Sequence, residues 1–216
     1  LRLLGESVAD PATIDRIMVD QGGFRMGPFT LLDLTGLDVS HAVMESVYHQ
    51  YYEEARFRPS PLTRQRLAAG LLGRKTGEGF YRYVEGKQQM PDEPAIATVS
   101  PCPVWISQDD PESAKALTAL VTAAGWSLET GTQPTEQALC LLTPFGEDAT
   151  SCSLRQGLDA EQCVAVDMLA GLDKRRSLMA TPITRSAFIQ AAQSLLNQDG
   201  TPVSTLQDSN GFVLQR

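Results

Sequence analysis

One glycine-rich segment of the chain could bind a phosphate group. Residues 73–81 read GRKTGEGFY, so three glycines that permit close backbone approach lie beside the cations Arg74 and Lys75. The phosphate loop of nucleotide-binding proteins has the pattern GxxxxGK[ST], in which the lysine follows the second glycine. Here the lysine and threonine precede that glycine. This order favours a structural role, in which the glycines form tight turns and the aromatic residues after them anchor the segment onto neighbouring helices.

Two histidines and four cysteines are the other candidates for chemistry. His41 and His49 lie eight residues apart on one predicted helix, where a solvated or partly packed side chain is expected more often than a catalytic base. The cysteines show no CxxC spacing and no nearby histidine, which argues against a zinc site and against a disulfide framework. They are Cys102, Cys140, Cys152 and Cys163. We therefore predict no metal site and reduced thiols.

Composition narrows the classes of function. The chain has 216 residues, of which 42% are hydrophobic and 20% charged, as is ordinary for one or two globular domains. Its net charge of −8 argues against nucleic acid as a partner, because phosphate binding requires a basic face. No apolar run approaches the ~18 residues of a membrane-spanning helix, and no signal segment opens the chain. We expect a cytoplasmic protein with no membrane partner.

Four short helices are predicted in the first part of the chain. Capping residues or prolines begin them, and glycines end most of them. Their starts lie at Asp10, Pro28, Asp38 and Ser60, and three of them end at Gly22, Gly36 and Gly70. Apolar residues repeat on the second and third helices and are expected to be buried. They are Phe29, Leu31, Leu32 and Leu34 on the second helix and Val39, Val43, Val47 and Tyr51 on the third.

The second part of the chain alternates between strand-like and helix-like segments. Residues 84–100 are polar and contain two prolines, which indicates a domain boundary. Continuous apolar runs after it predict a parallel α/β sheet with both faces covered. The predicted strands are 102–106, 126–130, 137–143, 162–169 and 176–180, and the predicted helices are 111–124 and 185–197.

The turn after the first of these strands argues against a bound dinucleotide. In a Rossmann domain this turn carries GxGxxG, whose backbone N–H groups and helix N-terminus hold the pyrophosphate. Here residues 107–111 read SQDDP, with no glycine. The carboxylates of Asp109 and Asp110 would repel the pyrophosphate. We therefore predict a Rossmann-like domain that has lost NAD binding and keeps a structural role.

Two blocks in the first part of the chain resemble a known family. One reads MGPFTLLDLTGLD from Met26, and the other reads LGRKTGEGFYRY and ends at Tyr83. In order, spacing and residue type they resemble the C-terminal helical domain of NAD-dependent 3-hydroxyacyl-CoA dehydrogenases. Arg25 departs from the family pattern, which has a proline there. The resemblance implies a domain that forms much of a dimer contact and part of an acyl-CoA cleft. Met26 and Phe29 are the candidate substrate-binding residues at that cleft, although apolar residues of a helical domain are more often core.

The last residues resemble a second part of the family. Residues 208–216 read DSNGFVLQR, similar to the DSPGFVxNR junction between the Rossmann and helical domains. Asn210 replaces the proline, and Gln215 stands where the family has a substrate-facing asparagine. The resemblance implies an α plus α/β fold, as in the longer bacterial members with a degenerate second unit. Its expected parts are a helical domain (1–85), a linker (86–100), a reduced Rossmann-like domain (101–209) and the start of a second helical domain (210–216).

For function, the resemblance implies a parent enzyme that oxidises a 3-hydroxyacyl-CoA to a 3-oxoacyl-CoA. In that family a histidine removes the hydroxyl proton and NAD⁺ accepts a hydride from C3. The histidine and its glutamate partner lie in the N-terminal NAD-binding domain, so this chain is expected to hold no catalytic residue and no NAD. Members of this type are associated with aromatic-acid degradation, including 3-hydroxyadipyl-CoA oxidation in phenylacetate breakdown.

Two hypotheses follow for the chain itself. In the first, it is an inactive central fragment whose partners are the missing N-terminal domain, a second helical domain, the acyl-CoA substrate and a second copy. In the second, it is a standalone structural or partner-binding protein built from the same modules. The uncapped helix at Leu1 and the interrupted junction at Arg216 favour the first.

Overall fold

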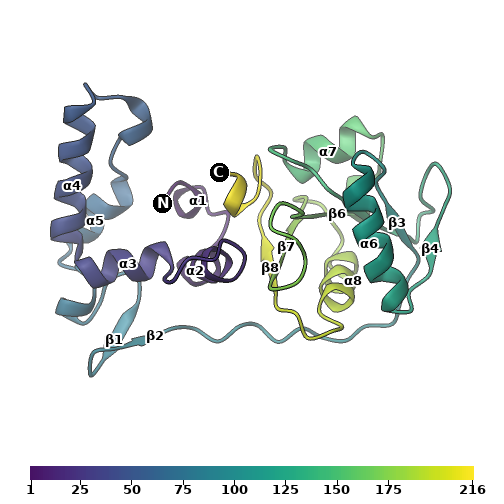
Figure 1. Cartoon of the computed structure of the whole chain (residues 1–216), viewed down its shortest axis with the longest axis horizontal. Helices are drawn as coiled ribbons and strands as arrows, with labels where there is room; N and C mark the ends of the chain where they lie inside the picture. The colour runs from purple at the N-terminus through teal and green to yellow at the C-terminus, as the bar shows by residue number, and fades with distance from the viewer. The chain divides into compact units, whose positions relative to one another are not determined.

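The chain folds into two compact units. The computed structural model describes all 216 residues (Figure 1). Unit 1 comprises Leu1–Val19 and Gly23–Glu93, and unit 2 comprises Asp20–Gly22 and Pro94–Arg216. None of the helices combines the length and the apolar character that crossing a bilayer requires. All five tyrosines lie in unit 1, whereas both tryptophans, Trp105 and Trp126, are buried in unit 2.

Unit 1 is helical and ends in a β-hairpin. Asp10 and Ser60 cap helices as predicted, since Thr13 N donates to Asp10 Oδ1 (2.9 Å) and Leu62 N donates to Ser60 Oγ (3.3 Å). The helices are α1 (Arg2–Gly5), α2 (Pro11–Asp20), α3 (Pro28–Thr35), α4 (Leu37–Gln50) and α5 (Pro61–Ala68), with short 3₁₀ turns η1 (Ala55–Phe57) and η2 (Arg74–Thr76). The antiparallel hairpin is β1 (Arg82–Val84) and β2 (Lys87–Gln89), so part of the segment expected as a linker is paired.

The prediction that Asp38 caps the third helix was wrong. Helix α4 begins one residue earlier, at Leu37, with Gly36 as its N-cap residue, and no side chain caps it. Asp38 lies in the first turn and forms an ion pair with Lys75 instead. The lysine of the glycine-rich segment is therefore used in a contact within unit 1.

Two buried carboxylates hold the helices and the glycine-rich segment together. Asp15 on α2 is 2% exposed and accepts hydrogen bonds of 2.8 Å from the backbone N–H groups of Phe29 and Thr30, at the start of α3. It also accepts from the hydroxyls of Thr30 and Tyr81, at 2.8 Å each. The carboxylate therefore neutralises the N-terminus of α3 and ties it to the end of the segment.

Asp33 on α3 is the second of these buried carboxylates. Its carboxylate accepts from the backbone N–H groups of Phe80 and Tyr81 (2.8 Å each) and from the Tyr83 hydroxyl (3.2 Å). Burial raises the pKa of Asp33, and these hydrogen bonds act in the opposite direction. The predicted anchoring of the glycine-rich segment by its aromatic residues is confirmed.

The apolar repeats of α3 and α4 are not buried as predicted. Phe29 is 1% exposed, but Leu31 and Leu34 are both 49% exposed, and Val43 is 56% exposed. The buried residues of α4 are instead Leu37 and His41. The chain itself covers only one side of these two helices. We call the exposed side the α3–α4 apolar surface. Its members are Leu31, Leu34, Val39, Val43 and Tyr51.

Unit 2 is a six-stranded sheet with helices on both faces. The strand order is β4-β3-β5-β6-β7-β8. The strands are β3 (Val104–Ile106), β4 (Leu128–Glu129), β5 (Leu139–Leu142), β6 (Cys163–Val166), β7 (Arg176–Ala180) and β8 (Val203–Leu206), and the helices are α6 (Pro111–Ala123), α7 (Ala149–Arg155) and α8 (Ser186–Leu196). The first four strands are parallel, but β7 is antiparallel to β6, so the prediction of an all-parallel sheet was wrong. The fold class of α plus α/β is confirmed.

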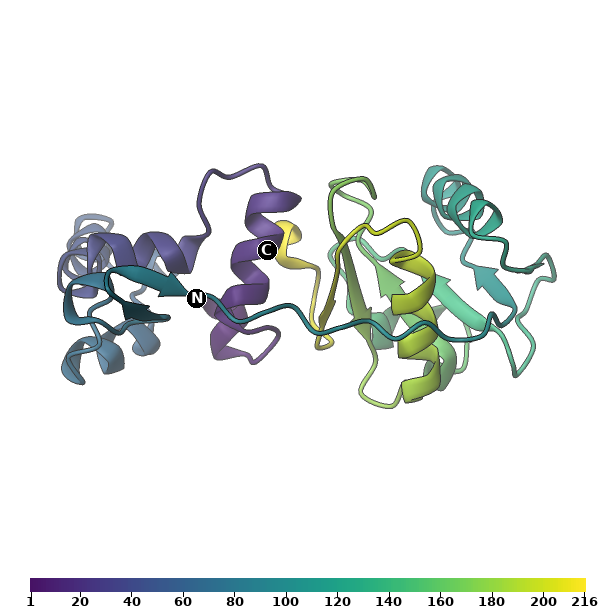
Figure 2. The ribbon, with the colours of Figure 1, turned by 90° about the horizontal axis from the view of Figure 1, so that it is seen from below.

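One apolar cluster forms the core of unit 2. It joins α6 and α8 to the strand residues on their side of the sheet, and its members include Leu117, Val121, Leu141, Val164 and Leu195. Helix α7 contacts β5 and β6 and lies outside this cluster. The extended segment before β3 passes α8 (Figure 2), where Val99 N donates to Ser194 Oγ at 3.2 Å. Helices α6 and α8 therefore share one face of the sheet, and α7 covers the other.

Candidate functional site

The carboxyl ends of β3, β5 and β6 form the place where an α/β sheet of this type holds a ligand. From β3 the chain passes through α6 to β4 on one side and later returns to β5 on the other side. Ligands bind at such a switch point, in the crevice outside the carboxyl ends of the strands. The residues that directly follow these strand ends are Ser107, Thr143 and Asp167.

The turn after β3 is occupied by its own polar groups. The buried Ser107 hydroxyl donates to Gln156 Oε1 (2.8 Å) and accepts from Asp109 N (3.3 Å). Asp110 accepts from the backbone N–H and the hydroxyl of Ser113, and the hydroxyl contact lowers the pKa of Asp110. The N-terminus of α6 is therefore already capped by a carboxylate of this chain.

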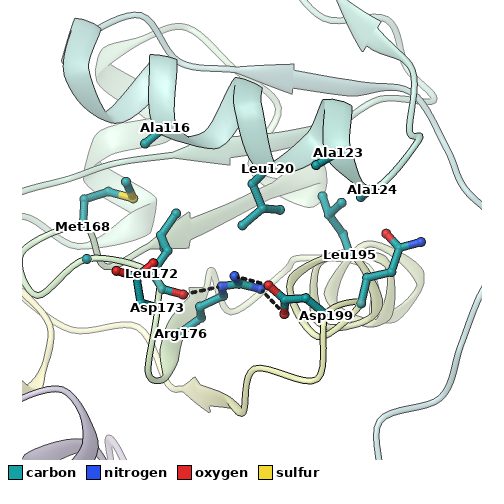
Figure 3. Close-up of a pocket in the computed structure, with 12 residues that line it drawn as sticks. Ala116, Leu120, Ala123, Ala124, Met168, Leu172, Asp173, Arg176, Leu195 and Asp199 are labelled. Carbon is teal, nitrogen blue, oxygen red and sulfur yellow. Dashed lines mark hydrogen bonds and ion pairs between the residues drawn. The ribbon is translucent and has the colours of Figure 1, made fainter.

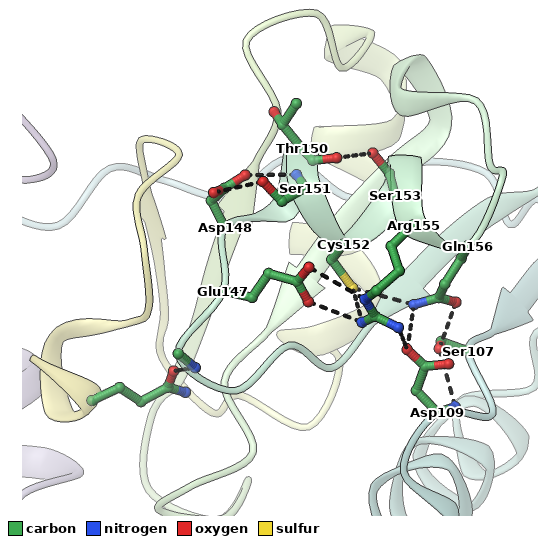
Figure 4. Close-up of polar contacts among 12 residues, drawn as sticks. Ser107, Asp109, Glu147, Asp148, Thr150, Ser151, Cys152, Ser153, Arg155 and Gln156 are labelled. Atoms are coloured by element: carbon green, nitrogen blue, oxygen red, sulfur yellow. Dashed lines mark hydrogen bonds and ion pairs between the residues drawn. The ribbon is translucent and has the colours of Figure 1, made fainter.

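A guanidinium bridges the loops that follow β3 and β5. Arg155, at the end of α7, donates through one terminal nitrogen to Asp109 Oδ2 (2.6 Å) and through the other to Glu147 Oε2 (2.9 Å), as Figure 4 shows. Gln156 Nε2 also donates to Asp109 Oδ2, at 3.0 Å. The two carboxylates raise the pKa of Arg155 above its ordinary value. Because Arg155 is half exposed, the bridge contributes little to stability, but it ties together the loops at the carboxyl ends of β3 and β5.

Cys152 lies beside this bridge and is not an activated nucleophile. Gln156 Nε2 is 3.2 Å from its sulfur. Burial, together with the nearby Glu147 carboxylate, raises the pKa of Cys152 to about 11. Nucleophilic attack requires the thiolate, so the side chain stays inert near neutral pH. All four cysteines of the chain are free thiols.

The residues at the switch point do not fit a dinucleotide. A pyrophosphate would need free backbone N–H groups at the start of α6 and a glycine that lets it approach. Instead the turn presents Asp109 and Asp110, and Arg155 is committed to two carboxylates across the crevice. Unit 2 therefore has the strand arrangement of a nucleotide-binding domain with the phosphate position filled from within.

A buried carboxylate, Asp167, directly follows β6 at the carboxyl ends of the strands. Asp167 is 0% exposed, and its Oδ1 accepts from Leu169 N (3.2 Å) and from Gln215 Nε2 (3.0 Å). Gln215 Oε1 in turn accepts from Gly146 N at 2.8 Å. The side chain at the position of the family's substrate-facing asparagine thus links the carboxyl ends of β5 and β6.

Two polar atoms at this edge have no partner. They are Asp167 Oδ2 and Thr143 Oγ1, and both are buried. An unpaired carboxylate oxygen in the interior is costly, and burial raises the pKa of Asp167. No sequence pattern predicts this buried group, because a single aspartate after an apolar strand is common on the protein surface.

This carboxylate predicts a pH dependence of stability. Because the folded-state pKa of Asp167 lies above its unfolded value, the folded state holds more protons in the window between the two, and the free energy of unfolding falls as pH rises through it. In Asp167→Asn this loss should disappear, so the variant gains stability relative to the wild-type chain as pH rises. Urea unfolding of both chains from pH 4 to 8 measures the difference. A difference that stays constant over this range would contradict the prediction.

The structure separates the candidate residues of unit 1. Met26 is at the surface, 37% exposed, whereas Phe29 is in the core with its ring 4.7 Å from that of Phe80. His49 is exposed on α4, but His41 is buried, and its Nδ1 lies 2.9 Å from Thr63 Oγ1. The expectation that His41 is solvated or partly packed was wrong, because α5 packs against that side of α4.

Comparisons with known proteins agree on one family. A family model described as "3-hydroxyacyl-CoA dehydrogenase, C-terminal domain" matches residues 1–83. The 3-hydroxyadipyl-CoA dehydrogenase of Escherichia coli K12 is 29% identical over 216 residues, which is 100% of this chain and 40% of that protein. Residues 1–83 therefore carry the C-terminal domain of the 3-hydroxyacyl-CoA dehydrogenases, and the chain as a whole is similar to members of that family. A probable 3-hydroxybutyryl-CoA dehydrogenase of Deinococcus radiodurans is 54% identical over 78 residues, which is 36% of this chain and 28% of that protein.

A solved structure extends the family match to both units. The crystal structure of 3-hydroxybutyryl-CoA dehydrogenase from Escherichia coli matches 100% of this chain and 40% of that chain, with a TM-score of 0.68 and 26% identity. The chain thus spans 40% or less of these family members. Residues 1–83 carry the family's helical domain, and unit 2 corresponds to a further part of the longer member.

Proposed function

We propose that this chain is the central part of a longer 3-hydroxyacyl-CoA dehydrogenase, in which it supplies scaffold and part of the acyl-CoA cleft. The observation that carries this is the switch point of unit 2, where Asp109, Glu147 and Arg155 fill the phosphate position. The family's reaction needs NAD, so the cofactor and the catalytic base would be held outside this chain. The chain covers 40% of its full-length relative, which leaves room for such a domain.

The substrate of the whole protein would be a 3-hydroxyacyl-CoA that becomes a 3-oxoacyl-CoA. One relative that matches the full chain is named for 3-hydroxyadipyl-CoA, which supports a dicarboxylic acyl group, whereas the solved structure that also matches the full chain is named for 3-hydroxybutyryl-CoA. Within this chain we propose Met26 and Phe29 for the cleft. The half-exposed Met26 would contact the acyl group, and the buried Phe29 would support the wall behind it.

The activity of the isolated chain tests the proposal. We expect the 216-residue chain to show no oxidation of NADH with acetoacetyl-CoA, because the proposal places the catalytic base and the cofactor in a domain outside this chain. The measurement is NADH absorbance in a preparation cleared of host dehydrogenases. A longer version with the preceding coding sequence is the positive control and should be active. Turnover proportional to the concentration of the isolated chain would overturn the proposal and favour an independent enzyme.

We further propose that the α3–α4 apolar surface binds a second copy of the chain. Half-exposed leucines and valines gathered on two adjacent helices are unusual for a monomer. The family's helical domain is expected to form a dimer contact, which supports a second copy as the occupant. If the chain is instead a standalone structural or partner-binding protein, this surface would be where its partner binds.

A charge on this surface should weaken the self-association. We expect Leu34→Asp to raise the dissociation constant about tenfold or more, because a carboxylate would be desolvated at the contact. Leu154→Asp is the matched control, since Leu154 is an exposed leucine of α7 in unit 2. Sedimentation velocity over a concentration series reads both. A wild-type chain that stays monomeric at high concentration, or equal effects of the two variants, would refute the proposed contact.

A further inference from the structure

Unit 2 contains a cavity that is lined by none of the residues assigned above to the proposed function. It has a volume of about 550 Å³, which falls in the range of small-molecule sites. Figure 3 shows α6 along one side of it, with Leu120 pointing toward Leu172 and Leu195. The cavity therefore lies on the face shared by α6 and α8. The switch point bridged by Arg155 from α7 is a different place.

Small side chains keep this cavity open. On α6 and its C-cap residue, the small side chains that line it are Ala116, Ala123 and Ala124, on either side of Leu120. Met168 and Leu172, from the loop between β6 and β7, complete the apolar wall. The wall contains no aromatic ring or charged side chain of α6, so an aliphatic body fits it without burying a polar group of the helix.

The cavity has a buried positive charge and exposed negative charges. Arg176 is 5% exposed, and its guanidinium donates to the backbone oxygens of Leu172 (2.8 Å) and Leu196 (2.5 Å). It also forms a two-point ion pair with Asp199, at 3.0 and 2.7 Å. The positive charge is therefore buried and already neutralised. Asp199 is 56% exposed at its side chain, and Asp173 is exposed, so the charges that face solvent here are carboxylates.

This arrangement selects the head group of a ligand. An anionic head would meet Asp173 and Asp199 and would have to displace Asp199 from Arg176. A cationic head that donates hydrogen bonds meets the carboxylate of Asp173 and the solvent-facing side of Asp199, whose charge Arg176 already balances, and it breaks no pair. We propose that the cavity binds an aliphatic amine, with its chain between Leu120 and Leu172 and its ammonium group at Asp173 and Asp199.

The direct test compares head groups on the same chain. The probes are octylamine, octanol and octanoate, each titrated into the full 216-residue chain below its own self-association concentration and followed by NMR shift changes. We expect saturable binding of octylamine, with shifts at α6 and the β6–β7 loop. Octanol should bind several-fold more weakly, and octanoate about tenfold more weakly or not at all. Equal binding of octanoate and octylamine, or shifts that do not saturate, would overturn the proposal.

Variants locate the site and the head group separately. Ala123→Trp should fill the cavity and weaken octylamine binding about tenfold. Ala119→Trp is the matched control, because Ala119 is an exposed alanine of the same helix that does not line the cavity. Asp173→Asn should weaken octylamine binding several-fold and leave octanol unchanged. Octylamine binding that is the same in Ala123→Trp and Ala119→Trp would place the ligand elsewhere and refute the cavity as its site.

Discussion

Gly73→Ala should unfold unit 1 or cost it about 4 kcal/mol of unfolding free energy. Gly73 has φ +111° and ψ −148°, a region that essentially only glycine occupies. An added Cβ would also overlap the backbone of Asp33, on its carbonyl oxygen and Cα. Two penalties therefore coincide at one residue, and the backbone of α3 cannot move aside as a flexible side chain could.

Gly77→Ala is the control for this prediction. Gly77 also has a positive φ, of +83°, but an added Cβ would meet no atom within 4 Å. We expect it to cost only about 1 kcal/mol, the cost of the left-handed conformation itself. Urea unfolding of the full chain, monitored by the hydrogen exchange of unit 1 amides, measures both. Equal costs for the two variants would show that the close approach to Asp33 contributes nothing.

Asp15→Ala should cost unit 1 about 3–5 kcal/mol. The substitution leaves four donors without their acceptor: two backbone N–H groups at the start of α3 and the hydroxyls of Thr30 and Tyr81. Buried donors that lose a charged acceptor pay their full desolvation cost. The substitution also removes the negative charge from the N-terminus of α3.

Asp10→Ala is the matched control, because Asp10 is an exposed helix cap that accepts from Thr13 alone. It should cost about 1 kcal/mol. Asp15→Asn should lie between the two, since the amide keeps one oxygen acceptor. Denaturant midpoints and slopes for the three variants test this order. An Asp15→Ala cost no larger than that of Asp10→Ala would mean that water replaces the carboxylate in the interior.

Local signals in the sequence were sufficient for much of the fold. The caps Asp10 and Ser60 fixed helix starts, because a cap and its N–H partner lie two or three residues apart. The apolar strands of unit 2 were also recognisable. Helix α7 was missed, because ATSCSLR has no apolar periodicity, and β8 was missed because VSTL is short. The antiparallel direction of β7 depends on how its loop packs, which no local pattern reveals.

Only part of the candidate site could be predicted, because its other contacts join residues far apart in the chain. The sequence showed that Asp109 and Asp110 would repel a pyrophosphate. It did not show Arg155, which comes from the missed helix α7 and lies 46 residues along the chain from Asp109. The buried pairs of Asp15 and Asp33 span 14 to 66 residues and were invisible as well. Exposure of the α3–α4 apolar surface depends on what covers a helix, and apolar spacing alone does not encode that.

The division of aromatic residues between the two units gives the chain its own optical reporters. Excitation at 295 nm is absorbed by Trp105 and Trp126, so the emission it produces comes from unit 2. Absorption by tyrosine arises in unit 1 only. Energy transfer from tyrosine to tryptophan therefore has to cross from one unit to the other. Its efficiency in the native chain, compared with a chain cleaved between residues 93 and 103, would report how close the units are in solution without any added label.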